Sequence, residues 1–487
     1  MGYDVLGRDD EPLSPTGKLF LQQDFYEVIN CVMGLETSID VEAVKAELKE
    51  SAMIKHPRFC SLLVGDKNGN EHWRKTQVDL DKHLIVLEDR VGEADDEEEV
   101  VNQYMADLAV SSPLATDKPL WEFHFLMAHK CGVLRFHHAL GDGVSFMSLF
   151  LACCKKVGDP NQSPILRRFW FFESSKKSQG NSKAWNFLMV FLHIINFLLK
   201  VLWIRDPKTA ISGGAGVELW PRKIAIAKLR LKDMKAVKRS VDGATINDVL
   251  FAIISSGLSR YLHYRTPKGV VRHDGRFSKS RWGNAIGVYL LPFQCNKSVA
   301  TPLDYVKRAK ESLDKKKLSL EAPFSHYVIG MTTHFFGSKV ASNLYYRLIS
   351  NTTFLVSNVA GPQEEISFAG HIIKFLRVNT SSLPHVSIQS QDNTWSDHGK
   401  GRTHTNTHPH THTHTHTTNP ENDLKTNEQL VGEWWMQALQ VNMVSYAGRA
   451  DLQIMVAKDI IPDPQFLAKC FEDSLLEMND AATNLQS

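Results

Sequence analysis

The spacing of hydrophobic and polar residues predicts a chain of mixed helices and strands. A stripe of valine and leucine predicts a helix that Asp40 caps and that stops near Pro57. Residues 123–127 and 133–138 predict two short strands. Residues 144–154 are apolar nearly all round, which is typical of a buried helix rather than a surface one.

The second half of the chain continues this mixture of elements. Residues 439–446 and 452–458 alternate in polarity and predict two strands joined by a turn at AGRAD. Residues 463–478 predict an amphipathic helix near the end of the chain. This order of elements favours an α/β protein with mixed, α+β sheets. Three further predictions are a helix at 244–264 and strands at 284–293 and 353–358.

An apolar segment at 185–204 is long enough to cross a membrane, at about 1.5 Å per residue. His193, Asn196 and Lys200 interrupt it, and a central lysine costs about 2.5 to 3.5 kcal/mol on insertion. Three interpretations stay open: a spanning helix, a helix lying in the membrane interface, and a buried connector. The first two predict contact with membrane lipids.

A length of 487 residues exceeds what one core organises, so two domains are expected. We expect an N-terminal domain at 1–170, a linker with the apolar segment at 171–220, and a C-terminal domain at 221–487. A low-complexity stretch at 383–436, containing HTNTHPHTHTHTHTT, interrupts the second domain. Opportunistic zinc or nickel binding and an inserted repeat both explain that tract, and we predict no functional metal site.

Composition excludes some classes of protein. The 56 basic and 54 acidic residues leave a net charge of +2, too even a balance for the field that nucleic acid selects. The seven cysteines are scattered and form no zinc-spaced pair, which favours reduced thiols facing the cytosol. The N-terminal residues lack the pattern of a secretory signal.

The segment HHALGDG carries the candidate chemistry. Alternation along the incoming strand places His137 and His138 on opposite faces, so the two cannot share one task. Gly141 and Gly143 permit a sharp turn that brings Asp142 back toward the strand end, where it can hold the backbone and orient an imidazole. A neutral imidazole can take the proton of an alcohol and return it to a leaving thiolate. A structural histidine pair beside a glycine-rich turn is the alternative.

The surrounding motifs extend this reading. HHALGDG is similar to the active-site motif of the CoA-dependent acyltransferases, and the whole chain resembles the plant wax ester synthase/diacylglycerol acyltransferase family. Relatives with a different acceptor resemble one another in a DFGWG segment, which this chain lacks. The low-complexity stretch departs from the family, which has only a short connection there. The matching segments are PLSP (Pro12, Leu13, Ser14, Pro15), PLW with Trp121, Asn247 with Asp248, and SNVAGP at 357–362.

The resemblance implies His138 as general base, Asp142 as a mainly structural residue, and His137 and Gly143 as supporting parts of the turn. It implies two chloramphenicol-acetyltransferase-like domains with the active site in a tunnel between them. Acyl-CoA is the implied co-substrate, fatty alcohol and diacylglycerol are the acceptors, and no cofactor is needed. The endoplasmic reticulum membrane, with the active domains facing the cytosol, is the implied location, and the plasma membrane is the alternative.

The other matching residues carry weaker predictions, each with a plainer alternative. PLSP resembles a segment of the acyl pocket, although it is also a rigid loop. Trp121 lines the substrate channel or belongs to the core. Asn247 and Asp248 position a helix facing the base, since both residues favour helix starts. The run Lys315 to Lys317 is a candidate for binding the CoA phosphates or a solvated charged face.

Overall fold

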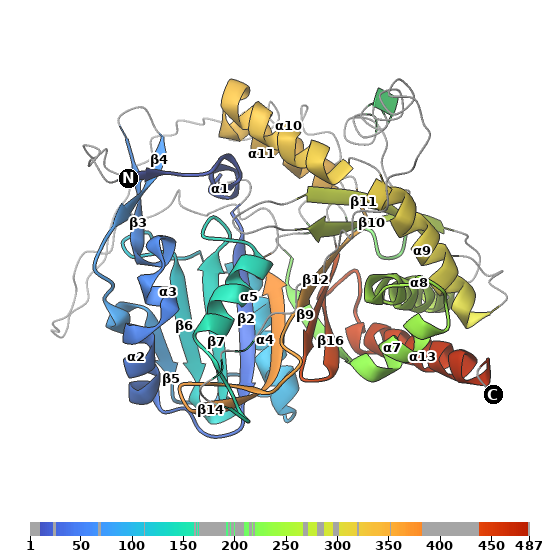
Figure 1. The fold of residues 1–487 in the computed structure, drawn as a ribbon, viewed down its shortest axis with the longest axis horizontal. Helices are drawn as coiled ribbons and strands as arrows, with labels where there is room; N and C mark the ends of the chain where they lie inside the picture. Colours follow the sequence, from blue (N-terminus) through green and yellow to red (C-terminus); the bar gives the residue numbers. More distant parts are fainter. Residues whose placement is uncertain are drawn as a thin grey trace, which may run out of the picture.

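The architecture consists of two large mixed sheets and a small third one, with helices on their faces (Figure 1). It is a computed structural model of the chain. Apart from a few isolated positions, it describes residues 10–22, 26–66, 70–111, 113–159, 209–213, 220–265, 271–279, 287–295, 301–318, 321–350, 352–381 and 438–485.

The N-terminal sheet has seven strands, and helices cover both of its faces. Helices α2 (Val41–Glu50), α3 (Ala52–Lys55) and α5 (Gly143–Ala152) pack on one face, and α4 (Glu97–Ser111) packs on the other. The strand order is β5 (Leu84–Leu87), β6 (Trp121–Leu126), β7 (Cys131–His137), β2 (Val28–Leu35), β14 (His371–Thr380), β13 (Ile366–Phe368) and β8 (Lys155–Lys156).

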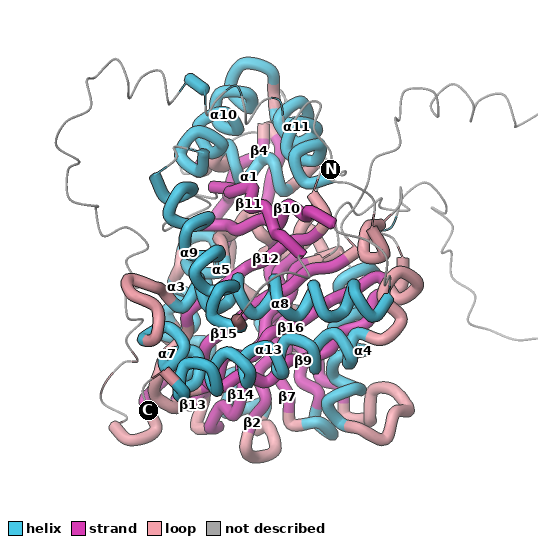
Figure 2. Tube along the Cα trace, turned by 90° about the vertical axis from the view of Figure 1, so that its right-hand side faces the viewer, coloured by secondary structure: helices cyan, strands magenta, loops and turns pink. Residues whose placement is uncertain are grey.

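The C-terminal sheet has six strands, and its core lies under four helices, of which α8 and α13 run side by side (Figure 2). These helices are α7 (Leu231–Arg239), α8 (Ile246–Arg265), α9 (Pro302–Leu318) and α13 (Pro464–Asn484). The strand order is β11 (Gly287–Cys295), β10 (Val271–Lys279), β12 (Phe354–Ala360), β15 (Leu439–Tyr446), β16 (Arg449–Ala457) and β9 (Arg222–Arg230).

A small cap lies at one end of the molecule, at the top of Figure 1. The short helix α1 (Pro15–Phe20) packs against the hairpin of α10 (Glu321–Phe336) and α11 (Ser338–Ser350). Beside it is a three-stranded sheet of β1 (Glu11–Pro12), β4 (Glu71–Lys75) and β3 (Ser61–Gly65).

The two halves of the chain interlock, which corrects the expected domain boundary. The sequence assigned every residue after 221 to the C-terminal domain, but β13 and β14 belong to the N-terminal sheet. Strand β14 pairs with β2 and thereby covers an edge that would otherwise be open. Arg377 of β14 also bonds Asp451 of the other sheet at 3.2 Å and Glu98 of α4 at 2.7 Å. Periodicity cannot reveal such an exchange, because it reports burial and not which strand is the neighbour.

Most predicted elements are confirmed. Asp40 caps α2, with its Oδ1 accepting a hydrogen bond from Ala43 N–H at 3.0 Å. That helix ends earlier than predicted, because Ser51 breaks it and caps the next helix, α3. The two last strands and the final helix lie where alternation and amphipathicity placed them. Helix α5 is buried along most of its length, as predicted.

Two predicted segments lie largely outside the described residues, namely the low-complexity stretch and the apolar segment at 185–204. Within the part of the chain that the structure describes, no helix combines the length and apolarity needed to cross a membrane. The same part contains no cluster of three or more histidine, cysteine or acidic side chains arranged to hold a metal ion.

Candidate active site

The two histidines lie at the end of β7, a strand buried along its whole length between β6 and β2. The predicted alternation is confirmed on this strand. Phe136 stacks on Phe146 of α5 with ring centroids 4.1 Å apart, whereas Val133 packs on the opposite face with α4. At the exit of the strand, the backbone N–H of His138 donates to the carbonyl of Glu27 at 2.9 Å. This bond fixes the point at which the chain turns.

His137 is enclosed and serves the turn. Its side chain is fully buried, and its Nδ1 accepts a hydrogen bond from the backbone N–H of Ala139 at 3.0 Å. Burial and the neighbouring His138 lower the pKa of His137 to about 3, against the opposing effect of the Phe20 carbonyl. The ring is therefore neutral near pH 7, with Nδ1 occupied as an acceptor. A group held in this way stabilises the turn and is not available as a base.

His138 occupies a different environment, under the short helix α1. Its ring stacks on Phe20 with centroids 4.2 Å apart and an interplanar angle of 20°. The residue is 8% exposed, so it is buried but not sealed on every side. Phe20 meets both histidines, one through its ring and the other through its carbonyl. Phe20 could not be predicted from the sequence, because nothing local links residue 20 to residue 138.

The PLSP segment builds the helix that carries Phe20. Ser14 caps α1, with its Oγ accepting from Gly17 N–H at 3.1 Å, and Pro15 occupies the first turn. Leu13 is buried in the core, and Pro12 pairs with β4. These four predicted residues therefore lie near the site as scaffold. Their role in placing Phe20 on His138 follows from the structure.

Asp142 forms the start of α5. Its Oδ1 accepts a hydrogen bond from Ser145 N–H at 2.8 Å, which is the backbone-holding task that the sequence suggested. Burial raises the pKa of this carboxyl to about 7, even though the Ser145 and Val144 N–H groups and Arg58 act in the opposite direction. Among the described residues its Oδ2 has no hydrogen-bond partner. Orientation of His138 by this carboxylate stays a prediction.

The motifs of the C-terminal half reach the same turn. A Cβ built on Gly143 would lie 3.2 Å from Cγ2 of Val359 in SNVAGP, so glycine lets the two segments meet closely. Next to it, Asn358 Nδ2 donates to Asn247 Oδ1 at 2.7 Å. Asp248 accepts from both the N–H and the hydroxyl of Thr245, at 2.6 and 2.8 Å, and so fixes the start of α8. The predicted helix-positioning role of Asp248 is thus visible, whereas Asn247 links the helix to the motif strand.

Trp121 is a core residue, which settles the two predicted possibilities against a channel. Its side chain is fully buried, and its indole Nε1–H donates to the carbonyl of Phe59 at 2.9 Å. His83 stacks on it with ring centroids 3.9 Å apart. Its burial and its bonded N–H place the tryptophan in the core.

A cavity of about 210 Å³ opens beside the turn, on the side of α5. Arg58 lies at this cavity and also donates to the carbonyl of Leu140, which ties it to the HHALGDG loop at 3.2 Å. His138 is not among the lining residues, so this cavity reaches the motif at the turn and not at the base. Its walls are Glu11, His56, Pro57, Arg58, Phe59, Phe136, Leu140, Gly141, Ser145, Phe146 and Leu149.

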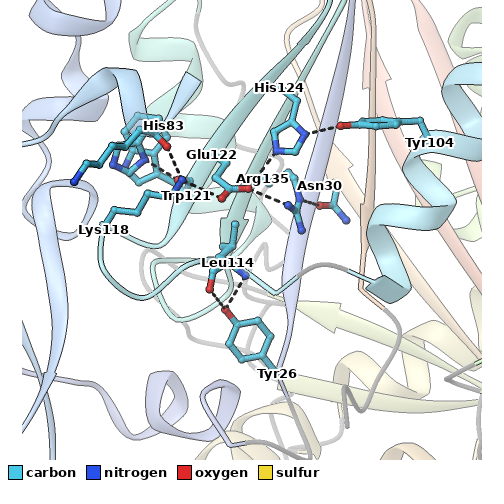
Figure 3. Close-up of polar contacts among 11 residues, drawn as sticks. Tyr26, Asn30, His83, Tyr104, Leu114, Lys118, Trp121, Glu122, His124 and Arg135 are labelled. Carbon is cyan, nitrogen blue, oxygen red and sulfur yellow. Dashed lines mark hydrogen bonds and ion pairs between the residues drawn. The ribbon is translucent and has the colours of Figure 1, made fainter. Parts of the chain in front are cut away.

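A buried polar network lies on the strands of the N-terminal sheet, where His124 also contacts Tyr104 of α4 (Figure 3). Arg135 bonds Glu122 of β6 at 3.0 Å and Asn30 of β2 at 3.2 Å. Glu122 is also approached by Lys118 at 3.1 Å and His124 at 3.2 Å. Burial raises the pKa of Glu122, but its partners His124, Lys118 and Arg135 outweigh burial and lower this pKa to about 2. The network joins three adjacent strands directly behind the motif, and the sequence did not single out its members.

Comparison with known proteins gives this geometry a context. Residues 35–196 match the model of the wax ester synthase/diacylglycerol acyltransferase catalytic domain, and residues 282–395 and 433–479 match that of the WS/DGAT C-terminal domain. Wax ester synthase/diacylglycerol acyltransferase 2 of Arabidopsis thaliana is 31% identical, over 97% of this chain and 96% of its own. Wax ester synthase/diacylglycerol acyltransferase 11 of the same plant is 33% identical, and the match covers 77% of this chain and 86% of the relative.

Solved structures share the fold. The wax ester synthase/diacylglycerol acyltransferase from Marinobacter aquaeolei VT8 has a TM-score of 0.55 at 15% identity, covering 97% of this chain and all of that one. The starter condensation domain of rhizomide synthetase, in complex with C8-CoA, has a TM-score of 0.52 at 13% identity, covering 97% and 95%. The family models and the relatives that match along the chain agree with the fold and with the order of the motifs. The chain therefore belongs to the wax ester synthase/diacylglycerol acyltransferase family.

Proposed function

We propose that this acyltransferase moves a long-chain fatty acyl group from acyl-CoA to the hydroxyl of a fatty alcohol, forming a wax ester, with diacylglycerol as a second acceptor. Its relatives' name, wax ester synthase/diacylglycerol acyltransferase, supports this pair of acceptors. The cavity against the HHALGDG turn has polar side chains among its walls, and its apolar wall of Phe59, Phe136, Phe146 and Leu149 could pack against a hydrocarbon chain. No cofactor enters the proposed reaction, and acyl-CoA is its co-substrate.

The proposed reaction uses one imidazole twice. A ring nitrogen of His138 takes the proton of the alcohol as its oxygen forms a bond to the thioester carbonyl carbon. The tetrahedral adduct then expels the CoA thiolate, and the imidazolium returns the proton to sulfur. Ester and free CoA leave, the histidine is again neutral, and no acyl-enzyme forms.

The observation that carries this proposal is the division of labour between the two histidines. His137 has its Nδ1 bonded to the turn and a pKa of about 3, so it is neutral and only a weak base near neutral pH. His138 instead lies under α1, where its ring stacks on Phe20, and the turn that follows it meets SNVAGP through Gly143 and Val359. Segments from both halves of the chain therefore meet at the turn that carries this imidazole, which supports its assignment as the catalytic group.

Replacing His138 with alanine tests the proposal. We expect ester formation to fall by about 10²- to 10⁴-fold, the usual contribution of a general base, while acyl-CoA binding and the thermal unfolding midpoint are kept. Undiminished product formation by His138→Ala would eliminate the base assignment. A chelator added to the native enzyme should leave turnover unchanged, because the proposed steps use no metal.

Two rival functions are open to the same assay. An acyltransferase for another hydroxyl would respond to His138→Ala but would turn over neither fatty alcohol nor diacylglycerol. A non-catalytic lipid-binding relative would form no ester with any acceptor while still binding acyl-CoA. Offering fatty alcohol and diacylglycerol in competition measures the preference directly, because tunnel shape sets acceptor choice.

The proposed location is the endoplasmic reticulum membrane, with the active domains facing the cytosol. The support is chemical, since the proposed acceptors dissolve in membranes. Cell fractionation with alkaline extraction tests it, and recovery of the whole chain in the soluble fraction without detergent would argue against it.

A further inference from the structure

The outer face of the α10–α11 hairpin exposes large apolar side chains to solvent. Tyr327, Met331 and Phe335 are spaced four residues apart, which places them on one side of α10. Tyr327 is 63% exposed and Phe335 64%, far more than is usual for aromatic residues of a globular protein. We call these three residues, together with Phe336 (71% exposed) and Val340 (48%), the hairpin face.

The inner side of the hairpin explains why the outer side is not simply core. Ile329, Ala341 and Leu348 are buried against α1, where they pack with Leu19 and Phe20. The hairpin has therefore already used one apolar side to build the cap over His138. The side chains of the hairpin face are exposed and so lie outside this contact, and the hairpin itself lies at the top end of the molecule in Figures 1 and 2. Five large apolar side chains that are exposed together, on a hairpin whose other side is already packed, indicate an external partner.

The charged residues in and around the α10–α11 hairpin indicate what kind of partner binds the hairpin face. No aspartate or glutamate occurs from residue 322 to residue 363, although 54 acidic residues nearly balance 56 basic ones over the chain. Within residues 322–350 of the hairpin, Lys339 and Arg347 are the charged residues, and His326 and His334 are also exposed. Aromatic side chains next to basic ones, with no acidic side chain among them, are the composition that binds the interface of an anionic lipid layer.

We propose that the hairpin face docks on a lipid surface bearing anionic head groups. The aromatic side chains would enter the boundary between head groups and acyl chains, and Lys339 would remain at the level of the phosphates. Docking would place the lipid one helical layer from the base, because α1 lies between the hairpin and His138. The link to acceptor supply rests on the proposed function, in which the acceptor is dissolved in that lipid.

The binding test uses the full-length chain and vesicles of phosphatidylcholine, with or without phosphatidylserine. Hydrogen exchange should slow in peptides from residues 324 to 340 when serine lipid is present, and should not change in α8 and α13. In Phe335→Ser/Phe336→Ser we expect vesicle affinity to fall at least tenfold. The matched control is Tyr264→Ser/Leu476→Ser, which removes two side chains that are 72% and 51% exposed elsewhere, and it should bind like the native chain.

An activity measurement separates this proposal from the proposed function. The hairpin variant should lose turnover of a long-chain alcohol presented in vesicles but keep turnover of a short-chain alcohol dissolved as monomers. His138→Ala should lose turnover of both alcohols. If it lost neither, the assignment of His138 as general base would be refuted, and the docking proposal would be unaffected.

Several results would overturn the docking proposal. They are unprotected hairpin peptides in vesicle-bound protein, native-like vesicle binding by the hairpin variant, and no vesicle binding by the native chain. A concentration-dependent dimer in sedimentation that disappears in the hairpin variant would show that a second copy of the chain, not lipid, covers the face.

Discussion

Two buried polar sites lie three residues apart, one on β7 and one just beyond its end, and their surroundings differ in kind. Arg135 in the middle of β7 has charged and amide partners on both neighbouring strands (Figure 3). At the end of the strand, His138 meets an aromatic ring, and Asp142 beyond it keeps one carboxylate oxygen without a hydrogen-bond partner among the described residues. At the first site, called the saturated site below, the charged groups have several polar partners. At the second, called the open site, one buried carboxylate oxygen has no partner among the described residues.

The contrast shows how to separate structural from functional burial. Many partners hold the pKa of Glu122 low, near 2, so its charge is permanent and serves the fold. The pKa of Asp142 rises to about 7 because burial is not matched by partners, so its charge is costly and sensitive to pH. Ion-pair networks of the fold also perturb pKa values, so Asp142 is a functional candidate because it adjoins the motif and not because of its pKa alone.

The largest effect is expected from breaking the saturated site. Arg135→Met leaves Glu122 buried beside fewer cations, and we expect the free energy of unfolding to fall by about 3 to 5 kcal/mol. Denaturation in urea, followed by circular dichroism, measures it. Lys374→Met is the control, because it removes an exposed ion pair with Glu36 and should leave the free energy of unfolding nearly unchanged. Equal losses in the two variants would show that the network is not the stabilising unit described above.

The raised pKa of Asp142 should make the free energy of unfolding depend on pH. The folded-state pKa of Asp142 lies above its ordinary value of 3.8, so its stabilising contribution is complete below pH 4 and is lost as pH rises through about 7. Relative to Asp142→Asn, the native chain should lose more than about 1 kcal/mol of unfolding free energy over that range. Asparagine also caps helices, so α5 should persist in the variant.

The pH experiment has an internal check. His137 acts in the opposite direction, because its folded-state pKa of about 3 lies below its ordinary value of 6.5 and stability is lost as pH falls from about 6.5 toward 3. Subtracting the Asp142→Asn profile from the native one cancels this contribution. A difference that stays flat between pH 4 and pH 7 would contradict the raised pKa of Asp142.

The smallest effect is expected where the two halves touch at the turn. Gly143→Ala would place a Cβ 3.2 Å from Val359, and we expect a loss of under about 1 kcal/mol in stability and a several-fold loss in turnover. Val359→Ala should restore activity when combined with it, because the shorter side chain makes room. The two changes should therefore be non-additive in a double-mutant cycle, and additive losses would mean that this contact does not shape the site.

The sequence by itself determined the local parts of this protein. The alternation of β7, the cap of α2, the buried α5 and the final hairpin and helix follow from spacing and capping chemistry, which act over a few residues. The motif HHALGDG identified the histidine pair and the turn for the same reason. The family followed from several motifs in one order, each too common to identify it alone.

Only the tertiary structure decided how these parts combine. It moved β14 into the N-terminal sheet, assigned Trp121 to the core and brought Phe20 onto His138. It also revealed the Arg135 network and the hairpin face, whose members are far apart in sequence or look like ordinary helix residues. The physical reason is the same in each case: contacts between distant segments depend on packing and strand order, which leave no period in the chain.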